Sequence, residues 1–169
     1  MAKKVLVAYA SKYGATAGIA EKIGEVLSEA GLTVDVAPAD KTEDPASYAG
    51  VVLGSAVYIG GWRKEAVKFL KKNRKKLAER PVWIFSSGPT GEGDPVELVK
   101  GWRYPKKLGD ALEEVEPVDI TVFHGAIDSE KLNALERFAI KNVKAEPGDF
   151  RDWEAITAWA KKIAAKLKK

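Results

Sequence analysis

The 169-residue sequence contains no cysteine, a single histidine and a single methionine. The lack of cysteine excludes disulfide bonds, iron–sulfur clusters, thiolate zinc sites and cysteine nucleophiles within this chain. One histidine, His124, cannot form a histidine pair or a histidine metal cluster by itself. We therefore expect no bound metal ion.

Long hydrophobic runs are also missing, since every apolar stretch is far shorter than the roughly 20 residues that span a bilayer. The apolar segment 5–9 resembles the start of a signal peptide, but Ser11 and Lys12 interrupt it and no small-residue cleavage site follows. Hydrophobic residues (46%) and charged residues (31%) occur in the proportions of a globular protein. The sequence thus predicts a cytoplasmic protein and offers little support for membrane contact.

Basic residues exceed acidic ones, with 28 Lys and Arg against 24 Asp and Glu and a net charge of +4. Much of the excess lies between Arg63 and Arg80, where Glu65 and Glu79 are the only acidic residues. This basic segment either attracts an acidic partner or is a solvated helix face. It contains no known nucleic-acid-binding module and no alternation of basic and aromatic residues, so we expect no nucleic acid partner.

Short apolar runs alternate with amphipathic segments along the chain. Strands are predicted at residues 5–9, 32–36, 51–55, 82–86 and 119–123. Helices are predicted at residues 15–30, 62–77, 105–115, 131–143 and 152–167. This alternation indicates one α/β domain over residues 1–169, with a parallel sheet covered on both faces. A ligand of such a sheet binds beyond the carboxyl ends of the strands, so the loops there are the candidate site.

The first of these loops joins the first strand to the first helix. It has the sequence Ser11, Lys12, Tyr13, Gly14, Ala15, Thr16. Small residues let the backbone N–H groups converge, and the helix N-terminus and two hydroxyl groups favour a phosphate. The loop lacks the GxxxxGK[ST] and GxGxxG patterns, which makes ATP and dinucleotides less favoured. A plain strand–helix turn with an N-cap explains the same residues equally well.

A second loop follows the third strand and combines aromatic residues with glycine. It contains Ser55, Ala56, Val57, Tyr58, Ile59 and Gly60, and Trp62 comes shortly after. Glycines allow a flat ligand to approach closely, and an aromatic ring can stack on it. Tyr58 is the better stacking candidate, because Trp62 is expected to be the first core residue of its helix.

A third loop, after the fourth strand, is polar and rich in glycine. It includes Ser87, Gly88, Pro89, Thr90 and Gly91. Such a loop offers backbone donors and acceptors to the edge of a heterocycle, although a flexible surface turn has the same composition. The three loops together suit a mononucleotide with a flat tricyclic base.

The segments 5–16, 53–58, 85–89 and 148–156 resemble flavodoxin-fold proteins, in particular the branch that includes the menaquinone-dependent protoporphyrinogen oxidases. The resemblance implies a flavodoxin-like three-layer sandwich whose five-stranded parallel sheet has the order 2-1-3-4-5. It also implies that FMN is the cofactor. Residues 11–16 would then hold its phosphate, residues 55–60 would line the isoalloxazine ring, and residues 87–91 would lie at the pyrimidine side.

Several functions remain open at this stage. The resemblance implies a redox flavoprotein, either an electron carrier or an FMN-dependent oxidoreductase linked to protoporphyrinogen or a quinone. Its partner would be a redox protein or a small-molecule electron donor or acceptor. An engineered or consensus flavodoxin-fold scaffold without redox activity is the alternative. His124 is a candidate proton donor or an ordinary loop histidine, so no catalytic residue is identified.

Overall fold

The computed structural model describes residues 3–58, 61–90, 93–128, 130, 133, 134, 136 and 148–169. Its centre is a parallel sheet of β1 (Lys4–Ala10), β2 (Thr33–Pro38), β3 (Gly50–Tyr58), β5 (Val82–Ser87) and β6 (Asp119–Phe123). The strands lie in the order β2-β1-β3-β5-β6. Counted among the five parallel strands alone, this is the predicted order 2-1-3-4-5. The two-residue strand β4 (Gly61–Trp62) is an antiparallel addition to β3.

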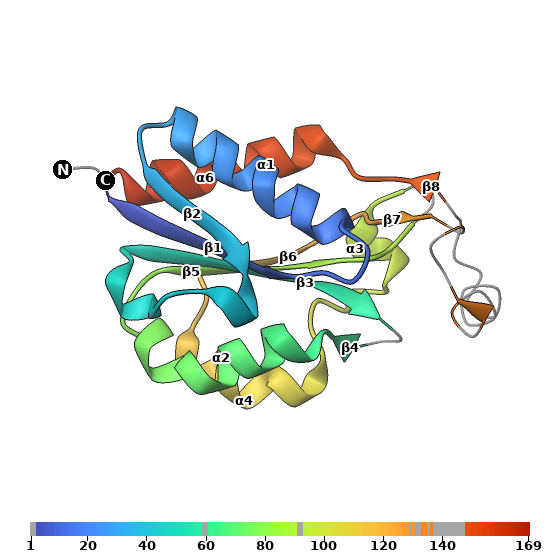
Figure 1. Ribbon diagram of the computed structural model, residues 1–169, viewed down its shortest axis with the longest axis horizontal. Helices are drawn as coiled ribbons and strands as arrows, with labels where there is room; N and C mark the ends of the chain where they lie inside the picture. The colour runs from blue at the N-terminus through green and yellow to red at the C-terminus, as the bar shows by residue number, and fades with distance from the viewer. Residues whose placement is uncertain are drawn as a thin grey trace.

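Helices cover both faces of the sheet, which makes three layers (Figure 1). On one face lie α1 (Ala15–Glu29) and α6 (Trp153–Leu167), and on the other lie α2 (Lys64–Leu77) and α4 (Gly109–Val115). A short helix, α3 (Pro95–Leu98), and the hairpin of β7 (Ala126–Ile127) and β8 (Gly148–Asp149) lie near the carboxyl ends of the strands. Both chain termini lie at the opposite end of the sheet.

Helices α1 and α6 form where the apolar spacing predicts them. Ile19, Ile23 and Leu27 of α1 are fully buried against the sheet, and three- and four-residue spacing places them on one face of the helix. The Asp152 side chain accepts a hydrogen bond from the Ala155 N–H at 3.1 Å, as expected of an N-cap. None of the helices in the described ranges is long and apolar enough to cross a membrane.

The sheet is buried between two apolar clusters, one under each helical layer. Phe85 lies at the centre of the α1/α6 side, with its ring centroid 5.7 Å from that of Phe123 and 6.1 Å from that of Trp159. This ring also requires Gly54 on the neighbouring strand, because a Cβ there would lie 2.0 Å from Phe85 Cζ. Burial on both faces explains why the central strands are apolar throughout.

Two predicted helices differ from the observed elements. The predicted helix at 62–77 begins only at Lys64, because Trp62 belongs to β4 and Arg63 has an extended backbone (φ −60°, ψ 141°). The predicted helix at 105–115 is a 3₁₀ turn, Lys106–Leu108, followed by α4. The predicted helix at 131–143 lies mostly outside the described residues.

Candidate functional site

Loop 1 (residues 11–16) connects β1 to α1 at the carboxyl edge of the sheet. Gly14 has a left-handed backbone (φ +92°) that favours glycine, and its N–H donates to the Ser11 hydroxyl at 3.0 Å. This turn sets the direction in which α1 begins. The Ser11 side chain therefore shapes the loop itself.

The first turn of α1 presents free hydrogen-bond donors. The first helical N–H groups lack intrahelical carbonyl partners, and the amides of Ala15, Thr16 and Ala17 have no partner within the described part of the chain. The first turn also contains no acidic side chain. Three unpaired amides at the positive end of a helix dipole form a site suited to an anion such as a phosphate.

Loop 3 (residues 87–91) is joined to loop 1 by a buried hydrogen bond. The hydroxyl oxygens of Thr16 and Ser87 lie 2.7 Å apart, and both side chains are buried. The two loops are 71 residues apart in sequence. This contact brings the first turn of α1 against the end of β5.

Loop 2 (residues 55–60) lies next to loop 3, since a Cβ on Gly88 would come within 3.1 Å of Val57 Cβ. The buried Ser55 hydroxyl accepts from the Arg63 N–H at 3.0 Å and donates to the Ala56 carbonyl at 2.9 Å. Ser55 thus fixes the start of α2, and contact between this loop and a flavin stays a prediction. The Tyr58 side chain, Ile59, Gly60 and Gly91 lie outside the described residues.

Hydrogen bonds of Trp62 and Ser86 connect loop 2 to the sheet. The Trp62 indole N–H donates to the Ser86 hydroxyl at 2.8 Å, and this hydroxyl donates to the Arg103 carbonyl at 3.0 Å. Trp62 is buried, as predicted for a core residue, but it reaches the core from β4 and not from a helix. A buried chain of satisfied hydrogen bonds of this kind stabilises one loop arrangement.

Glu136 is a buried carboxylate that contacts loop 1. It is 2% exposed, and its Oε2 lies 2.5 Å from Lys12 Nζ. Its Oε1 accepts hydrogen bonds from the Tyr13 hydroxyl and from the Asn133 N–H. The hydrogen bond to Glu136 raises the pKa of the Tyr13 phenol above its ordinary value. Lys12 and Tyr13 therefore hold Glu136 against loop 1.

This pair predicts a large effect of removing the lysine. The Lys12→Met variant should lose about 2 kcal/mol of unfolding free energy, because the buried Glu136 carboxylate loses its ion pair with the Lys12 ammonium group. The expected loss of unfolding free energy is smaller than for a fully buried ion pair, because the Lys12 side chain is 31% exposed. Urea unfolding at pH 7 measures it. The double variant Lys12→Met/Glu136→Gln should recover at least about half of the loss; no recovery would mean that the ion pair is not the cause.

Arg151 is another residue of this edge that the sequence analysis did not assign. Its guanidinium donates to the Ala15 carbonyl at 3.3 Å and to the Asp149 carboxylate at 2.7 Å. The absence of a side chain on Gly18 makes room for it, because a Cβ there would lie 2.7 Å from Arg151 Nη1. The segment 148–156 contains both Asp149 and Arg151, but nothing in its sequence indicates that Arg151 contacts α1.

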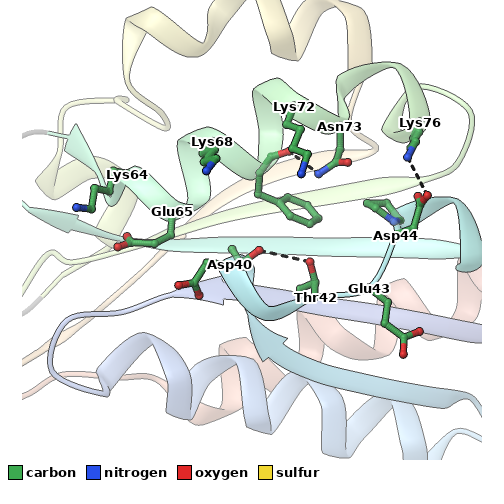
Figure 2. Close-up of a pocket in the computed structure, with 13 residues that line it drawn as sticks. Asp40, Thr42, Glu43, Asp44, Lys64, Glu65, Lys68, Lys72, Asn73 and Lys76 are labelled. Atoms are coloured by element: carbon green, nitrogen blue, oxygen red, sulfur yellow. Dashed lines mark hydrogen bonds and ion pairs between the residues drawn. The ribbon is translucent and has the colours of Figure 1, made fainter.

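A groove lies elsewhere, between α2 and the segment 39–45, and has a volume of about 910 Å³. Figure 2 shows a row of lysines along α2 facing Asp40, Glu43 and Asp44. Lys76 pairs with Asp44 at 2.8 Å. The groove contains no residue of loops 1 to 3. Its mixed charge does not select an ion of either sign.

Comparisons with known proteins agree with the α/β fold. A sequence profile of the flavodoxin domain matches residues 6–153. The chain belongs to the flavodoxin domain family. It is 24% identical over 172 residues to protoporphyrinogen IX dehydrogenase [quinone] of Escherichia coli (strain K12), and the match covers 95% of this chain and 94% of that protein.

Solved structures confirm the family's fold. A flavodoxin from the domain Archaea superposes with a TM-score of 0.63 at 14% identity, covering 98% of this chain and 99% of that one. Oxidised flavodoxin 2 from Bacillus cereus gives a TM-score of 0.61 at 23% identity, covering 96% and 99%. Membership of this family supports a redox flavoprotein in general and a flavin as its cofactor.

Proposed function

We propose that this flavodoxin-domain protein binds FMN at the carboxyl edge of β1, β3 and β5 and acts as an oxidoreductase. The observation that carries the proposal is the first turn of α1, with three unpaired amides, no acidic side chain and the Thr16–Ser87 contact to loop 3. These features fit a phosphate monoester that is bound by neutral donors. Membership of the flavodoxin domain family supports a flavin on that phosphate.

The residues have distinct roles in this proposal. The amides at the start of α1 hold the phosphate, and Ser11 keeps the turn in place through its bond to Gly14. The backbone of loops 2 and 3 lines the ring. Hydrogen bonds of the Ser55 and Ser86 hydroxyl groups keep these loops in place. When bound, the flavin supplies the transfer of electrons, and the protein orients it and tunes its electrostatic surroundings.

The substrate of such a protein is proposed from its relative. Similarity to protoporphyrinogen IX dehydrogenase [quinone] over 95% of the chain supports an enzyme that is linked to protoporphyrinogen or a quinone. A flavodoxin-like carrier that exchanges electrons with a partner protein is the second candidate, supported by the superposition on flavodoxins. Turnover of protoporphyrinogen with a quinone by the FMN-loaded protein distinguishes the enzyme from the carrier.

The binding proposal predicts discrimination between FMN and riboflavin. The apoprotein should bind FMN about 100-fold more tightly than riboflavin, because only FMN carries the anion that the amides of α1 accept. Titration followed by flavin and tryptophan fluorescence measures both dissociation constants. Equal affinities would refute the phosphate site at α1. Failure to bind either flavin would favour the alternative, a flavodoxin-fold scaffold without redox activity.

A further inference from the structure

Helix α2 is the most basic element in the part of the chain that the structure describes. It contains seven lysine and arginine residues and a single acidic residue, Glu65. The helix packs against the sheet through a set of buried apolar side chains, Ala66, Phe69, Leu70 and Leu77. Its basic residues therefore occupy the opposite, exposed side.

Four lysines form a row along this exposed side. Residues that are three or four positions apart lie on the same face of a helix, and the members of this row are Lys64, Lys68, Lys71 and Lys75. All of them are exposed. We call this row the lysine stripe. At about 1.5 Å per residue, it extends about 16 Å along the helix axis.

Two cations at the sides of the stripe are paired within the chain. Arg74 pairs with Glu114 of α4 at 3.2 Å, and Lys76 pairs with Asp44 at 2.8 Å. In the described ranges, by contrast, no ion pair or side-chain hydrogen bond includes a lysine of the stripe. Unpaired positive charge on α2 is therefore concentrated in the stripe and in Lys72 beside it.

The stripe lowers the stability of the helix that carries it. Like charges three or four residues apart repel each other, and every lysine of the stripe has another at one of these spacings. Lys64 also begins α2, where the positive end of the helix dipole disfavours a cation. The exposed side of α1 avoids such repulsion by mixing both signs, with Lys22 and Glu25 3.5 Å apart. A row of carboxylates from another molecule would remove the repulsion on α2.

We propose that the lysine stripe is a docking surface for an acidic helix of a partner protein. Glutamates on that helix at successive spacings of four, three and four residues would lie opposite the lysines when the two helices align. This series of spacings is the same in both directions, so either orientation of the partner helix fits. The proposal does not depend on a flavin, because the stripe includes no residue of loops 1 to 3.

Carboxylates beside the stripe favour a narrow partner over a broad one. Glu114 lies on one side, next to Arg74. On the other side, the groove is lined by Asp40, Glu43 and Asp44 (Figure 2). A flat anionic surface such as a membrane would approach these carboxylates together with the lysines. A single helix, about 10–12 Å across, can contact the stripe alone.

Two synthetic helical peptides of equal composition test the docking surface. The matched peptide is alanine-rich and carries four glutamates at the spacing of the stripe, and the control peptide carries them distributed around the helix. Fluorescence anisotropy of the labelled peptides measures dissociation constants. We expect the matched peptide to bind at least about fivefold more tightly than the control peptide. Its affinity should fall about tenfold between about 0.02 M and about 0.2 M salt.

Charge reversal locates the binding surface on the protein. The Lys68→Glu/Lys71→Glu variant should weaken binding of the matched peptide at least about tenfold. Its urea unfolding midpoint should not fall below that of the wild type, because the change removes like-charge neighbours. The control, Lys161→Glu/Lys162→Glu, changes the net charge equally at exposed residues of α6 and should alter binding less than about twofold.

Several results would overturn the proposal. Equal affinity for the two peptides, or equal weakening by both charge reversals, would mean that net charge alone explains binding. No binding of the matched peptide would refute the docking surface directly. Vesicles of one part phosphatidylglycerol to three parts phosphatidylcholine test the other occupant. If the protein bound them but not the matched peptide, and Lys68→Glu/Lys71→Glu abolished this binding, the stripe would be a membrane contact. None of these measurements requires FMN, so they stand even if the proposed function fails.

Discussion

The Ala15→Glu variant should bind FMN at least about 100-fold more weakly than the wild type, while its fold remains intact. A carboxylate in the first turn of α1 places a negative charge beside the amides that are proposed to hold the phosphate. The same charge interacts favourably with the helix dipole, so the apoprotein should keep or slightly gain stability, by about 0.5 kcal/mol. FMN titration and urea unfolding measure the two effects independently.

A matched control lies on the same helix. Ser28→Glu adds the same charge in the last turn of α1, on an exposed residue about 20 Å from Ala15 along the helix axis. It should leave FMN affinity within about twofold of the wild type, since exposed charges at this distance are screened. An equal loss in both variants would attribute the effect to net charge and would contradict a phosphate site at the start of α1.

The Gly54→Ala variant should lose more than about 3 kcal/mol of unfolding free energy, which is a large part of the about 5–15 kcal/mol that stabilises a typical domain. The added Cβ would lie 2.0 Å from Phe85 Cζ. The Phe85 ring cannot move aside easily, because it is fully buried and packs against Phe123 and Trp159. Urea unfolding followed by tryptophan fluorescence measures the loss.

Gly109→Ala is the control for this change. Gly109 begins α4 with a helical backbone (φ −53°), and a Cβ there meets no atom within 4 Å. Alanine at such a position should be neutral or stabilise by about 0.5 kcal/mol. If Gly54→Ala also stayed within about 1 kcal/mol of the wild type, the packing of Phe85 against β3 would not be as close as the structure shows.

Local patterns along the chain predicted the fold well. The buried segments 51–55 and 82–86 are central strands, and the half-polar segment 32–36 belongs to the edge strand β2. Such patterns work because burial on one face or on both selects side chains at fixed spacing. The order of the strands came only from the resemblance to flavodoxins, since periodicity carries no information about which strands are neighbours.

The short elements could not be predicted in the same way. Trp62 has the spacing of a helix residue, but pairing with β3 and the bond from Arg63 to Ser55 keep it in β4. The hairpin of β7 and β8 joins segments about twenty residues apart, each only two residues long. Two residues are too few to show a periodicity, so pairing between distant parts of the chain determines these elements.

By itself, the sequence determined the type of the long elements within the described residues and placed three small-residue loops at one edge of the sheet. These properties depend on residues that are neighbours in the chain. Only the tertiary structure decided which side chains meet there. Thr16 meets Ser87, Lys12 meets Glu136 and His124 meets Pro89 and Gly93 across separations of 31 to 124 residues. Contacts of this kind depend on how the layers pack, and no local pattern records them.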